Sequence, residues 1–268
     1  MRLFFLASAL LAPAFASAQI EPARPDPGMQ IRLCVPDMEV PPYSHDKGRQ
    51  GTVPQLLRMA ADKAATSISS QTLPLRRCHE LLRQGLVDAS LISYSAEAAS
   101  AFRFPDDAGP ANNPPAQLAA LRVKLYRLRN SPANWDGRQF FHAMRVGVQH
   151  DTILVRRLLS ELPIQVDYNN FTAQQQVDKL LAGRFDLLLG LSDQLDPIVS
   201  SSGLSDKIEA LAEPFITAHV YLAFSPQFVE SSGTVAQTMW RAIADLNRAG
   251  VMQRLLRDPQ HQPAGLAK

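Results

Sequence analysis

The sequence predicts an α/β protein with two similar lobes, each built on a mostly parallel sheet. Strand-like and helix-like segments alternate in the order strand, helix, strand, helix, strand, and this order occurs twice. Such a series requires parallel strands joined by right-handed crossovers. The second series repeats the plan of the first. Both "CHELLRQGLVDASLIS" (residues 78–93) and "QVDKLLAGRFDLLLGLS" (residues 176–192) place paired leucines before a glycine and an apolar strand.

The first series begins with a strand at residues 31–35, which stops at Pro36. A helix is predicted over residues 56–65, where leucines and alanines recur three and four positions apart. The series continues with a strand at residues 67–73, a helix at residues 75–84 that Gly85 closes, and a strand at residues 87–93. A proline-rich break without periodicity follows at residues 104–115.

The second series follows a strand at residues 119–128, in which apolar and basic residues alternate. Asp151 or Thr152 is the predicted N-cap of a helix that runs through Leu159. The other segments of the series are strands at residues 145–148, 164–168 and 185–191 and a helix at residues 173–181 that Gly183 closes. A strand at residues 219–226 and an amphipathic helix at residues 238–256, interrupted by Gly250, complete the chain.

The N-terminus has the pattern of a signal peptide at residues 1–18. Arg2 precedes a short apolar run, and Ala16-Ser17-Ala18 is an A-x-A site, so we expect cleavage after Ala18 and export to the periplasm. The run is shorter than the roughly 18 apolar residues of a membrane span, and the alternative is an uncleaved anchor. Residues 19–30 are rich in proline and charge and are expected to form a flexible leader.

Composition and charge bear on the class of partner. Charged residues make up 19% and hydrophobic residues 46% of the chain, and the formal net charge is +2, which is ordinary for a globular protein. The chain has no run of lysine and arginine, so a nucleic-acid partner is not expected. We expect a monomer that holds no cofactor.

Two cysteines, Cys34 and Cys78, remain after signal cleavage, and we expect them to form a disulfide in an oxidising compartment. The bond would close a loop of about 45 residues, for which the chain-entropy model gives about 4 kcal/mol. The alternatives are two free thiols or a metal pair. The spacing is not C-x-x-C and no histidine stands at zinc-finger spacing, so we expect no metal site.

Two lobes in succession predict a cleft between them. Ligands of parallel sheets bind where the carboxyl ends of strands meet loops and helix N-termini. Residues 36–44 follow the first strand, and their prolines are expected to stiffen a loop that presents Tyr43 to the cleft. The alternative is a surface turn in which Tyr43 covers the edge of the sheet.

Short motifs along the chain carry a family resemblance. They are Pro41-Pro42-Tyr43, Arg76-Arg77-Cys78, the set Leu82, Gly85 and Asp88, Ser95-Ala96-Glu97-Ala98, Phe104-Pro105, "VGVQHDT" at residues 146–152, and the set Leu181, Gly183, Arg184 and Asp186. In this order and spacing, they resemble the pattern of the periplasmic solute-binding proteins of the amino-acid type (solute-binding family 3, type II periplasmic-binding fold). The resemblance covers nearly the whole chain after the signal peptide.

The resemblance implies a fold of two lobes joined by two hinge strands, near residues 119–126 and 215–224. Lobe 1 would comprise residues 31–120 and 222–268, and lobe 2 would comprise residues 121–221. The resemblance also implies that the lobes close around a small polar solute, without chemistry, for import by an inner-membrane ABC permease.

Three positions depart from the family pattern. The family's arginine that clamps the carboxylate of an amino-acid ligand is Ala98 here, which offers no donor. Asp151 replaces the glycine whose backbone N–H meets the same carboxylate. Leu191 stands where an acidic residue receives the ligand's amino group, with Asp193 two residues on. A standard α-amino acid is therefore not the expected ligand, and the alternatives are a cationic, polar or unusual ligand, or a loss of ligand binding.

Positions at strand ends, helix starts and the proline-rich loop supply the predicted ligand contacts. Tyr43 would stack on the ligand, Arg77 would donate to an anionic group, and Asp193 would bind a cationic group. The full predicted set is Tyr43, Arg77, Ser93, Tyr94, Ser95, Asp151, Thr152 and Asp193. Each contact has a structural alternative. Tyr43 would be an exposed loop aromatic, Arg77 a helix-surface charge and Asp193 a loop aspartate. Ser93, Tyr94 and Ser95 would cap a strand, and Asp151 would be a helix N-cap. Arg103 lies near Ala98 and could replace the missing arginine.

The sequence lacks the motifs of common enzymes. It has no G-x-S-x-G, no H-E-x-x-H, no phosphate loop and no dinucleotide fingerprint. His150 beside Asp151 could form an acid–base pair, but adjacent residues on a turn seldom face one site. We expect a binding protein rather than an enzyme. The alternatives are a ligand-sensing or partner-docking protein of the same fold, and a periplasmic enzyme of the dehydratase type.

Overall fold

The structure is a computed structural model that describes residues 29–109, 114–142, 145–168, 172–201 and 203–258. The predicted signal peptide, and all of the predicted leader except Met29 and Gln30, lie outside the described residues. Within the described ranges, no helix has the length and apolar character that a membrane crossing requires.

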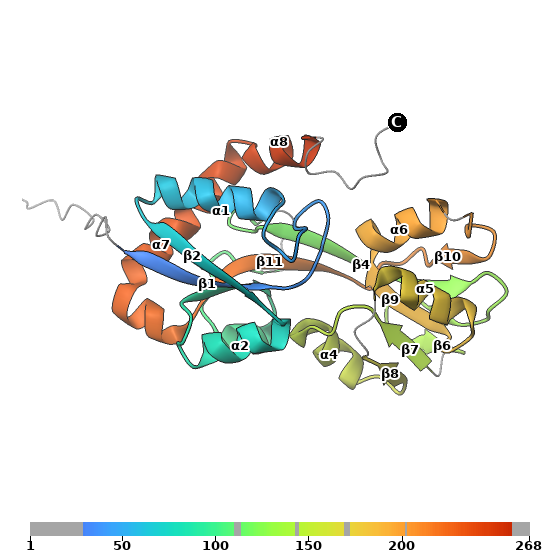
Figure 1. Ribbon diagram of the computed structural model, residues 1–268. Helices are drawn as coiled ribbons and strands as arrows, with labels where there is room; N and C mark the ends of the chain where they lie inside the picture. The colour runs from blue at the N-terminus through green and yellow to red at the C-terminus, as the bar shows by residue number, and fades with distance from the viewer. Residues whose placement is uncertain (1–28, 110–113, 143–144, 169–171, 202, 259–268) are drawn as a thin grey trace, which may run out of the picture.

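A single sheet runs through two lobes of the described chain (Figure 1). The strands are β1 (Gln30–Pro36), β2 (Ser67–Leu73), β3 (Ala89–Ser93), β4 (Ala119–Leu128), β5 (Asn134–Trp135), β6 (Phe140–Phe141), β7 (Arg145–Val148), β8 (Gln165–Asp167), β9 (Leu187–Leu191), β10 (Ile208–Ala210) and β11 (Ile216–Phe224). The order in the sheet is β2-β1-β3-β11-β4-β9-β7-β8, with β10 on β4, while β5 and β6 form a separate pair. β1 is parallel to β2 and β3, and β7 is parallel to β8 and β9, which confirms the predicted fold class.

Helices cover both faces of the sheet in the part of the chain that the structure describes. They are α1 (Thr52–Lys63), α2 (Leu75–Arg83), α3 (Ala96–Ala101), α4 (Ile153–Ser160), α5 (Ala173–Leu181), α6 (Ser192–Ser201), α7 (Pro226–Arg248) and α8 (Val251–Arg257). In the first lobe, α1 and α2 lie on opposite sides of β1 and β2 (Figure 1).

The burial of β1 explains why the first lobe has helices on both sides. Ile31, Leu33 and Val35 belong to one core cluster with the buried faces of α1, α7 and α8. Cys34 points to the other side of the strand and packs in a second cluster with residues of α2. Successive residues of a strand point to opposite faces, so the apolar run of β1 contacts two helical layers.

Cys34 and Cys78 form the predicted disulfide, with an Sγ–Sγ distance of 2.01 Å. Both residues are completely buried. The bond joins the end of β1 to the first turns of α2, so it fixes that helix against the sheet. No group of His, Cys, Asp or Glu residues in the described ranges is arranged to hold a metal ion.

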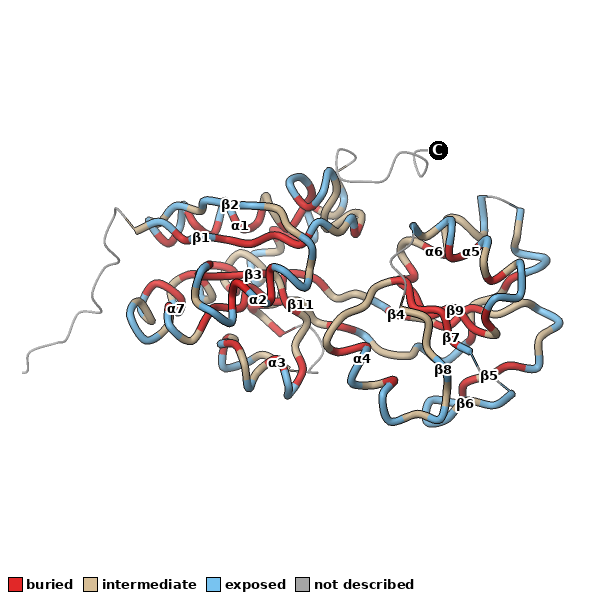
Figure 2. Tube along the Cα trace, turned by 60° about the horizontal axis from the view of Figure 1, so that its bottom comes forward, coloured by how far each residue is buried: buried red, intermediate tan, exposed pale blue. Residues whose placement is uncertain are grey.

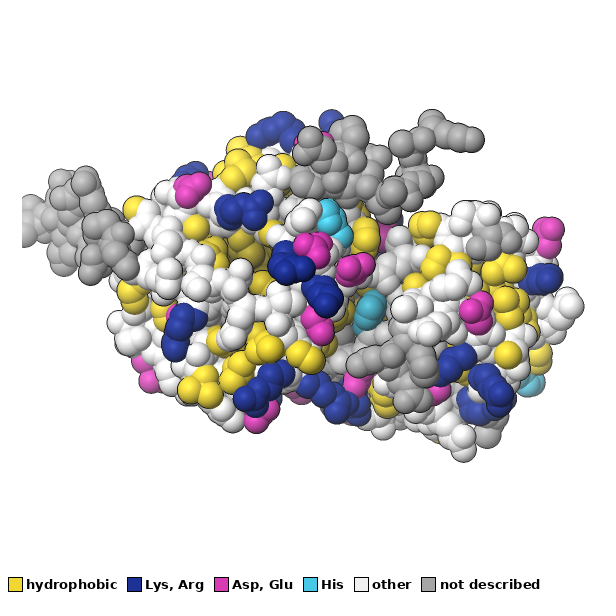
Figure 3. Space-filling model, in the orientation of Figure 1, with side chains coloured by type: hydrophobic (Ala, Val, Ile, Leu, Met, Phe, Trp, Pro, Cys, Tyr) yellow, Lys and Arg dark blue, Asp and Glu magenta, His cyan; other side chains and the backbone are white. Residues whose placement is uncertain are grey.

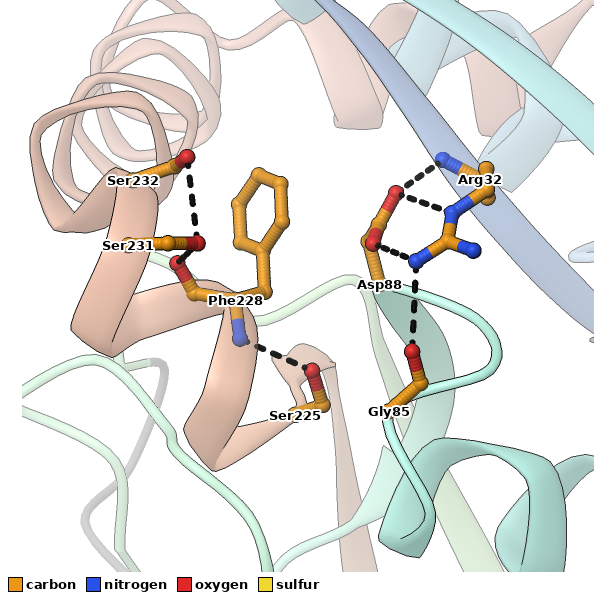
Figure 4. A network of polar contacts seen from close by, with 7 residues as sticks. All are labelled: Arg32, Gly85, Asp88, Ser225, Phe228, Ser231 and Ser232. Carbon is orange, nitrogen blue, oxygen red and sulfur yellow. Dashed lines mark hydrogen bonds and ion pairs between the residues drawn. The ribbon is translucent and has the colours of Figure 1, made fainter.

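The repeated aspartate of the two series has the same structural role in each lobe. Asp88 accepts hydrogen bonds from the backbone N–H of Arg32 at 2.7 Å and from its Nη2 at 2.6 Å, and the same Nη2 donates to Gly85 O (Figure 4). Asp186 likewise accepts from the backbone N–H of Arg145 at 2.9 Å. Each aspartate therefore joins the last strand of its series to the first strand. The internal repetition in the sequence thus corresponds to a repeated set of contacts.

The start of the C-terminal helix differs from the prediction. α7 begins at Pro226 rather than at residue 238, and β11 covers Ile216–Phe224 rather than residues 219–226. Ser225 Oγ caps the helix by accepting from Phe228 N at 3.1 Å, and Pro226 suits the first turn because its missing N–H needs no partner there (Figure 4). Ser232 has non-helical backbone angles, which kink the helix just before the part that the periodicity predicts.

The sequence analysis predicts neither α3 nor α6. α6 contains Pro197, a residue that normally opposes a helix interior. Because α6 follows β9 directly, Asp193 lies in the first turn of a helix and not in the loop that the alternative interpretation assigned to it.

The lobes are connected through the antiparallel pair β4 and β11, which occupies the centre of the sheet. Figure 2 shows buried segments within each lobe and mainly intermediate exposure where this strand pair crosses between them. The lobe boundaries predicted at residues 120/121 and 221/222 fall within these two strands and remain a prediction.

Candidate ligand-binding site

A cavity of about 100 Å³ lies between the two lobes. Lobe 1 supplies the end of β1, the loop that follows it, and parts of α2 and β3, including Val35, Leu75 and Leu91. The start of α4 in lobe 2 supplies Ile153 and Leu154. Among the described residues that line the cavity, none carries a carboxylate, an ammonium or a guanidinium group. The site is therefore apolar and uncharged, with a few neutral polar groups.

The proline-rich loop after β1 reaches from lobe 1 to the core of lobe 2. Val40 is buried in the same cluster as Val146 and Leu189 of lobe 2, and Tyr43 packs against the cores of both lobes. Tyr43 Oη donates to Ala120 O at 3.4 Å. Burial, and to a lesser extent a nearby carboxylate, raise the pKa of Tyr43. The loop thus presents Tyr43 to the cleft, as the sequence analysis expects.

Gly51 allows the loop to pass close to the start of α1. Its φ of 117° lies in the region that favours glycine. A Cβ at this position would stand 2.5 Å from Tyr43 O, which is too close for any side chain. Gly51 therefore lets the start of α1 lie against the backbone of Tyr43, beside the cavity.

Three of the predicted contacts are brought together by the structure. Tyr43, Ser93 and Thr152 all line the cavity, from the loop, from β3 and from the N-terminus of α4. Thr152 is also the N-cap of α4, since its Oγ1 accepts from Val155 N at 3.2 Å. The sequence analysis names Asp151 or Thr152 as this cap, and Thr152 is the one.

The other predicted contacts do not line the cavity. Arg77 is exposed and pairs with Glu80 on its own helix, at 2.9 Å. Ser95 Oγ caps α3 by accepting from Ala98 N at 3.1 Å. The ring of Tyr94 packs against Phe104 and Tyr221, with centroid distances of 5.4 and 6.3 Å. Asp193 pairs with Arg122 at 3.2 Å. Contact of these residues with a ligand remains a prediction.

Two of the positions that depart from the resembled pattern, Ala98 and Leu191, pack in the core of their lobes. Ala98 is completely buried in the cluster that contains Phe102 and the disulfide. Leu191 is buried in the core of lobe 2. Arg103 forms a backbone bridge with Phe224 and does not line the cavity.

Asp151 forms ion pairs with two arginines, one of them from the opposite lobe. Arg76 Nη2 lies 2.6 Å from Asp151 Oδ2, and Arg156 Nε lies 2.6 Å from Oδ1. The Asp151 side chain is 7% exposed, whereas that of Arg76 is 73% exposed. Figure 3 shows both signs of charge meeting at the surface between α2 and α4. The carboxylate of Asp151, a predicted ligand contact, is therefore already paired with protein groups.

Replacing Asp151 by alanine is expected to favour opening of the lobes by about 1 kcal/mol. The value is small because Arg76 is well solvated and the pair across the lobes is screened. Small-angle X-ray scattering at low salt would show a larger radius of gyration for Asp151→Ala than for wild type. Asp46→Ala is the matched control, because Asp46 pairs with Arg49 and accepts from Gln50, both in its own loop of lobe 1. An unchanged radius in Asp151→Ala would contradict a role for this pair in holding the lobes together.

Other polar contacts also join the lobes. Arg157 of α4 pairs with Glu97 of α3 at 2.8 Å. Gln194 of α6 donates to the backbone oxygen of Glu39 in the loop after β1. The lobes therefore contact each other through several groups of the protein itself.

His79 is a titratable residue of the cavity that is absent from the predicted set of ligand contacts. It is 8% exposed, it lines the cavity, and its Nε2 has no hydrogen-bond partner within the described residues. Burial and the nearby charge of Arg83 lower the pKa of His79 to about 4, so the imidazole is neutral at physiological pH. The available signal was its place next to Cys78, because the disulfide holds this turn of α2 beside the end of β1.

Solved structures of ligand-binding and sensor proteins share this fold. The substrate-binding protein of an amino-acid ABC transporter is 14% identical, with a TM-score of 0.60 over 85% of this chain and 97% of that chain. The GluR0 ligand-binding core from Nostoc punctiforme, in complex with L-glutamate, is 15% identical, with a TM-score of 0.61 over 84% of this chain and 96% of that one. A histidine kinase sensor domain with similarity to periplasmic binding proteins is 17% identical, with a TM-score of 0.61 over 84% and 93% of the two chains.

No protein-family model and no curated protein sequence matches the chain. At these levels of identity, the structural likeness establishes the fold, which is the two-lobed type II periplasmic-binding fold that the sequence resemblance implies.

Proposed function

We propose that this protein is a periplasmic solute-binding protein that closes its lobes around one small molecule and delivers it to an inner-membrane ABC permease. The observation that carries the proposal is the cavity between the lobes, which Tyr43 and Ser93 line from lobe 1 and Thr152 lines from lobe 2. A molecule that contacts both walls binds the closed arrangement better than an open one, and this difference favours closure.

The lining of the cavity favours binding over catalysis. Serine hydroxyls and the imidazole of His79 line it, but no carboxylate of a described residue does. A serine–histidine pair in the cavity would therefore lack the third group that orients the imidazole in hydrolases. We propose a binding protein and not an enzyme of the dehydratase type.

A second candidate is a sensing or docking protein that shares the fold without a transport role. Contacts between the protein's own groups favour it, above all the ion pair of Arg76 with Asp151 across the lobes. Such contacts stabilise a closed arrangement before any ligand binds. The sensor domain among the similar structures shows that this fold also occurs in signalling proteins.

A thermal-shift screen of the purified protein tests the proposed function. The panel holds amino acids, polyamines, organic acids, small peptides, sugars and neutral aromatic compounds. A ligand that binds only the folded state stabilises it by about 2.7 kcal/mol at a hundred times its dissociation constant. A shift with one chemical class would support solute binding. No shift with any class, in protein shown to be free of carried-over ligand, would support the sensing or docking role.

A variant with a filled cavity makes this screen specific for the site. Ser93→Leu adds volume to the cavity wall, and we expect it to abolish the shift that a ligand produces in wild type. Ser100→Leu is the matched control, since Ser100 is exposed on α3 and does not line the cavity. An equal ligand-induced shift in wild type and Ser93→Leu would place the ligand elsewhere.

A further inference from the structure

The polar groups of the cavity are neutral, and several already have protein partners. Tyr43 Oη donates to Ala120 O, and Ser44 Oγ donates to Met38 O at 3.2 Å. Thr152 Oγ1 accepts from the backbone of α4. His79 is different, because its buried Nε2 has no partner in the part of the chain that the structure describes.

The lining disfavours ligands that carry a charge. Moving an isolated carboxylate or ammonium group out of water is costly unless a partner of opposite charge receives it. The nearby carboxylates of Asp151 and Asp193 are engaged by Arg76, Arg156 and Arg122. A zwitterionic amino acid in this cavity would therefore leave both of its charges without partners.

The walls favour an apolar molecule of modest size. Val35, Leu75, Leu91 and Leu121 form a large part of the lining, together with Ile153 and Leu154 of lobe 2. Transfer of apolar surface from water to such walls contributes about 25 cal/mol per Å². Apolar cavities on the order of 150 Å³ hold a molecule the size of benzene. This cavity, at about 100 Å³, is smaller, so a ligand with a single aromatic ring fits once the lobes separate slightly.

The imidazole of His79 lacks a partner that a ligand could supply. A neutral imidazole has one donor nitrogen and one acceptor nitrogen, so either tautomer can pair with a hydroxyl group. An unpaired buried polar group costs about 1–3 kcal/mol. Less than 1 Å² of Nε2 is accessible, so a ligand pairs with it once the imidazole turns toward the cavity, and it then recovers part of this cost. The disulfide Cys34–Cys78 lies beside His79 in α2 and holds this turn of the helix at the cavity.

We propose that the cavity binds an uncharged, mainly apolar small molecule that carries one hydroxyl or carbonyl group, and that His79 forms the hydrogen bond with that group. The inference rests on the proposed function, since it names the ligand class of the same site.

Phenol and toluene form a matched pair of probes, because they have nearly the same shape and differ in one hydrogen-bonding group. Titration calorimetry on the purified protein is expected to show phenol binding about tenfold more tightly than toluene. His79→Phe is expected to remove this difference while it leaves toluene binding within about twofold of wild type. His79→Gln keeps a neutral hydrogen-bonding group and is expected to retain part of the preference.

A measurement on the wild-type protein does not depend on how the variants fold. In ¹⁵N NMR spectra, phenol is expected to shift the imidazole signals of His79, and toluene is expected to shift them much less. His219 is the internal control, because its Nδ1 already lies 2.7 Å from Gln117 Oε1 and it does not line the cavity.

The outcomes separate this inference from the proposed function. Equal affinity for phenol and toluene, with no selective shift of the His79 signals, would overturn the role of His79. Binding of L-glutamate or L-arginine, with no binding of either neutral probe, would overturn the ligand class and leave solute binding intact. If neither the neutral nor the charged probes bind, both the inference and the proposed function fail.

Discussion

Loss of the Cys34–Cys78 disulfide is expected to lower the free energy of unfolding by about 4 kcal/mol. The bond joins residues that are 44 positions apart, and the chain-entropy model gives this value for a loop of that length. Both cysteines are completely buried, so alanine is a better replacement than serine, whose hydroxyl would need a partner. We expect the protein without the bond to fold, but at a clearly lower midpoint.

The measurement is guanidinium unfolding of wild type, Cys34→Ala, Cys78→Ala and the double variant. Either single substitution removes the bond, so the loss in the double variant should be much smaller than the sum of the two single losses. Additive losses, or a total loss below about 1 kcal/mol, would contradict a stabilising cross-link. Because the bond also holds His79 at the cavity, ligand binding is expected to weaken in these variants without being abolished.

Replacing Asp88 by alanine is expected to destabilise the protein by about 2 kcal/mol. The Asp88 side chain is 9% exposed and accepts from the backbone N–H, Nε and Nη2 of Arg32. Its removal leaves the Arg32 N–H without this partner and removes a link between β1 and β3. The Arg32 side chain is 54% exposed and remains hydrated, which keeps the loss below the value for a fully buried ion pair.

Asp186→Ala is the matched control for this prediction. Asp186 holds the equivalent place in lobe 2, but its side chain is 29% exposed and its ion pair with Arg145 is long, at 3.9 Å. We therefore expect a loss of less than half that of Asp88→Ala in urea unfolding. Equal losses of unfolding free energy in the two variants would show that the aspartate stabilises the protein through the shared strand geometry and not through burial of its carboxylate.

Much of the fold can be predicted from local patterns. The predicted limits of β2, β4, β7 and α5 agree with the structure, because alternation, helical spacing and closing glycines are properties of neighbouring residues. The disulfide was predictable too, since the chain has only two cysteines. The helix predictions failed where a local signal opposed the structure. Pro197 argues against a helix where α6 lies, and the kink at Ser232 separates the start of α7 from the periodic part that was predicted.

The candidate site was predictable in outline. The sequence placed Tyr43, Ser93 and Thr152 at the ends of elements that face a cleft, and the structure brings all three to one cavity. It pointed to Arg77 and not to Arg76, which pairs with Asp151 across the lobes. The choice depends on Asp151, which is 75 residues away in the chain.

Residue patterns along the chain are enough to predict the two α/β series, the disulfide and the loop that carries Tyr43. Each of these follows from residue spacing along the chain or from a small number of residues of one type. Three features follow only from the folded chain: the described lining of the cavity is uncharged, Asp151 is engaged by Arg76 and Arg156, and His79 lines the cavity. These features cannot be read from spacing because the state of a charged or polar side chain depends on its burial and its nearest partners. Those partners come from the opposite lobe or from distant elements of the sheet.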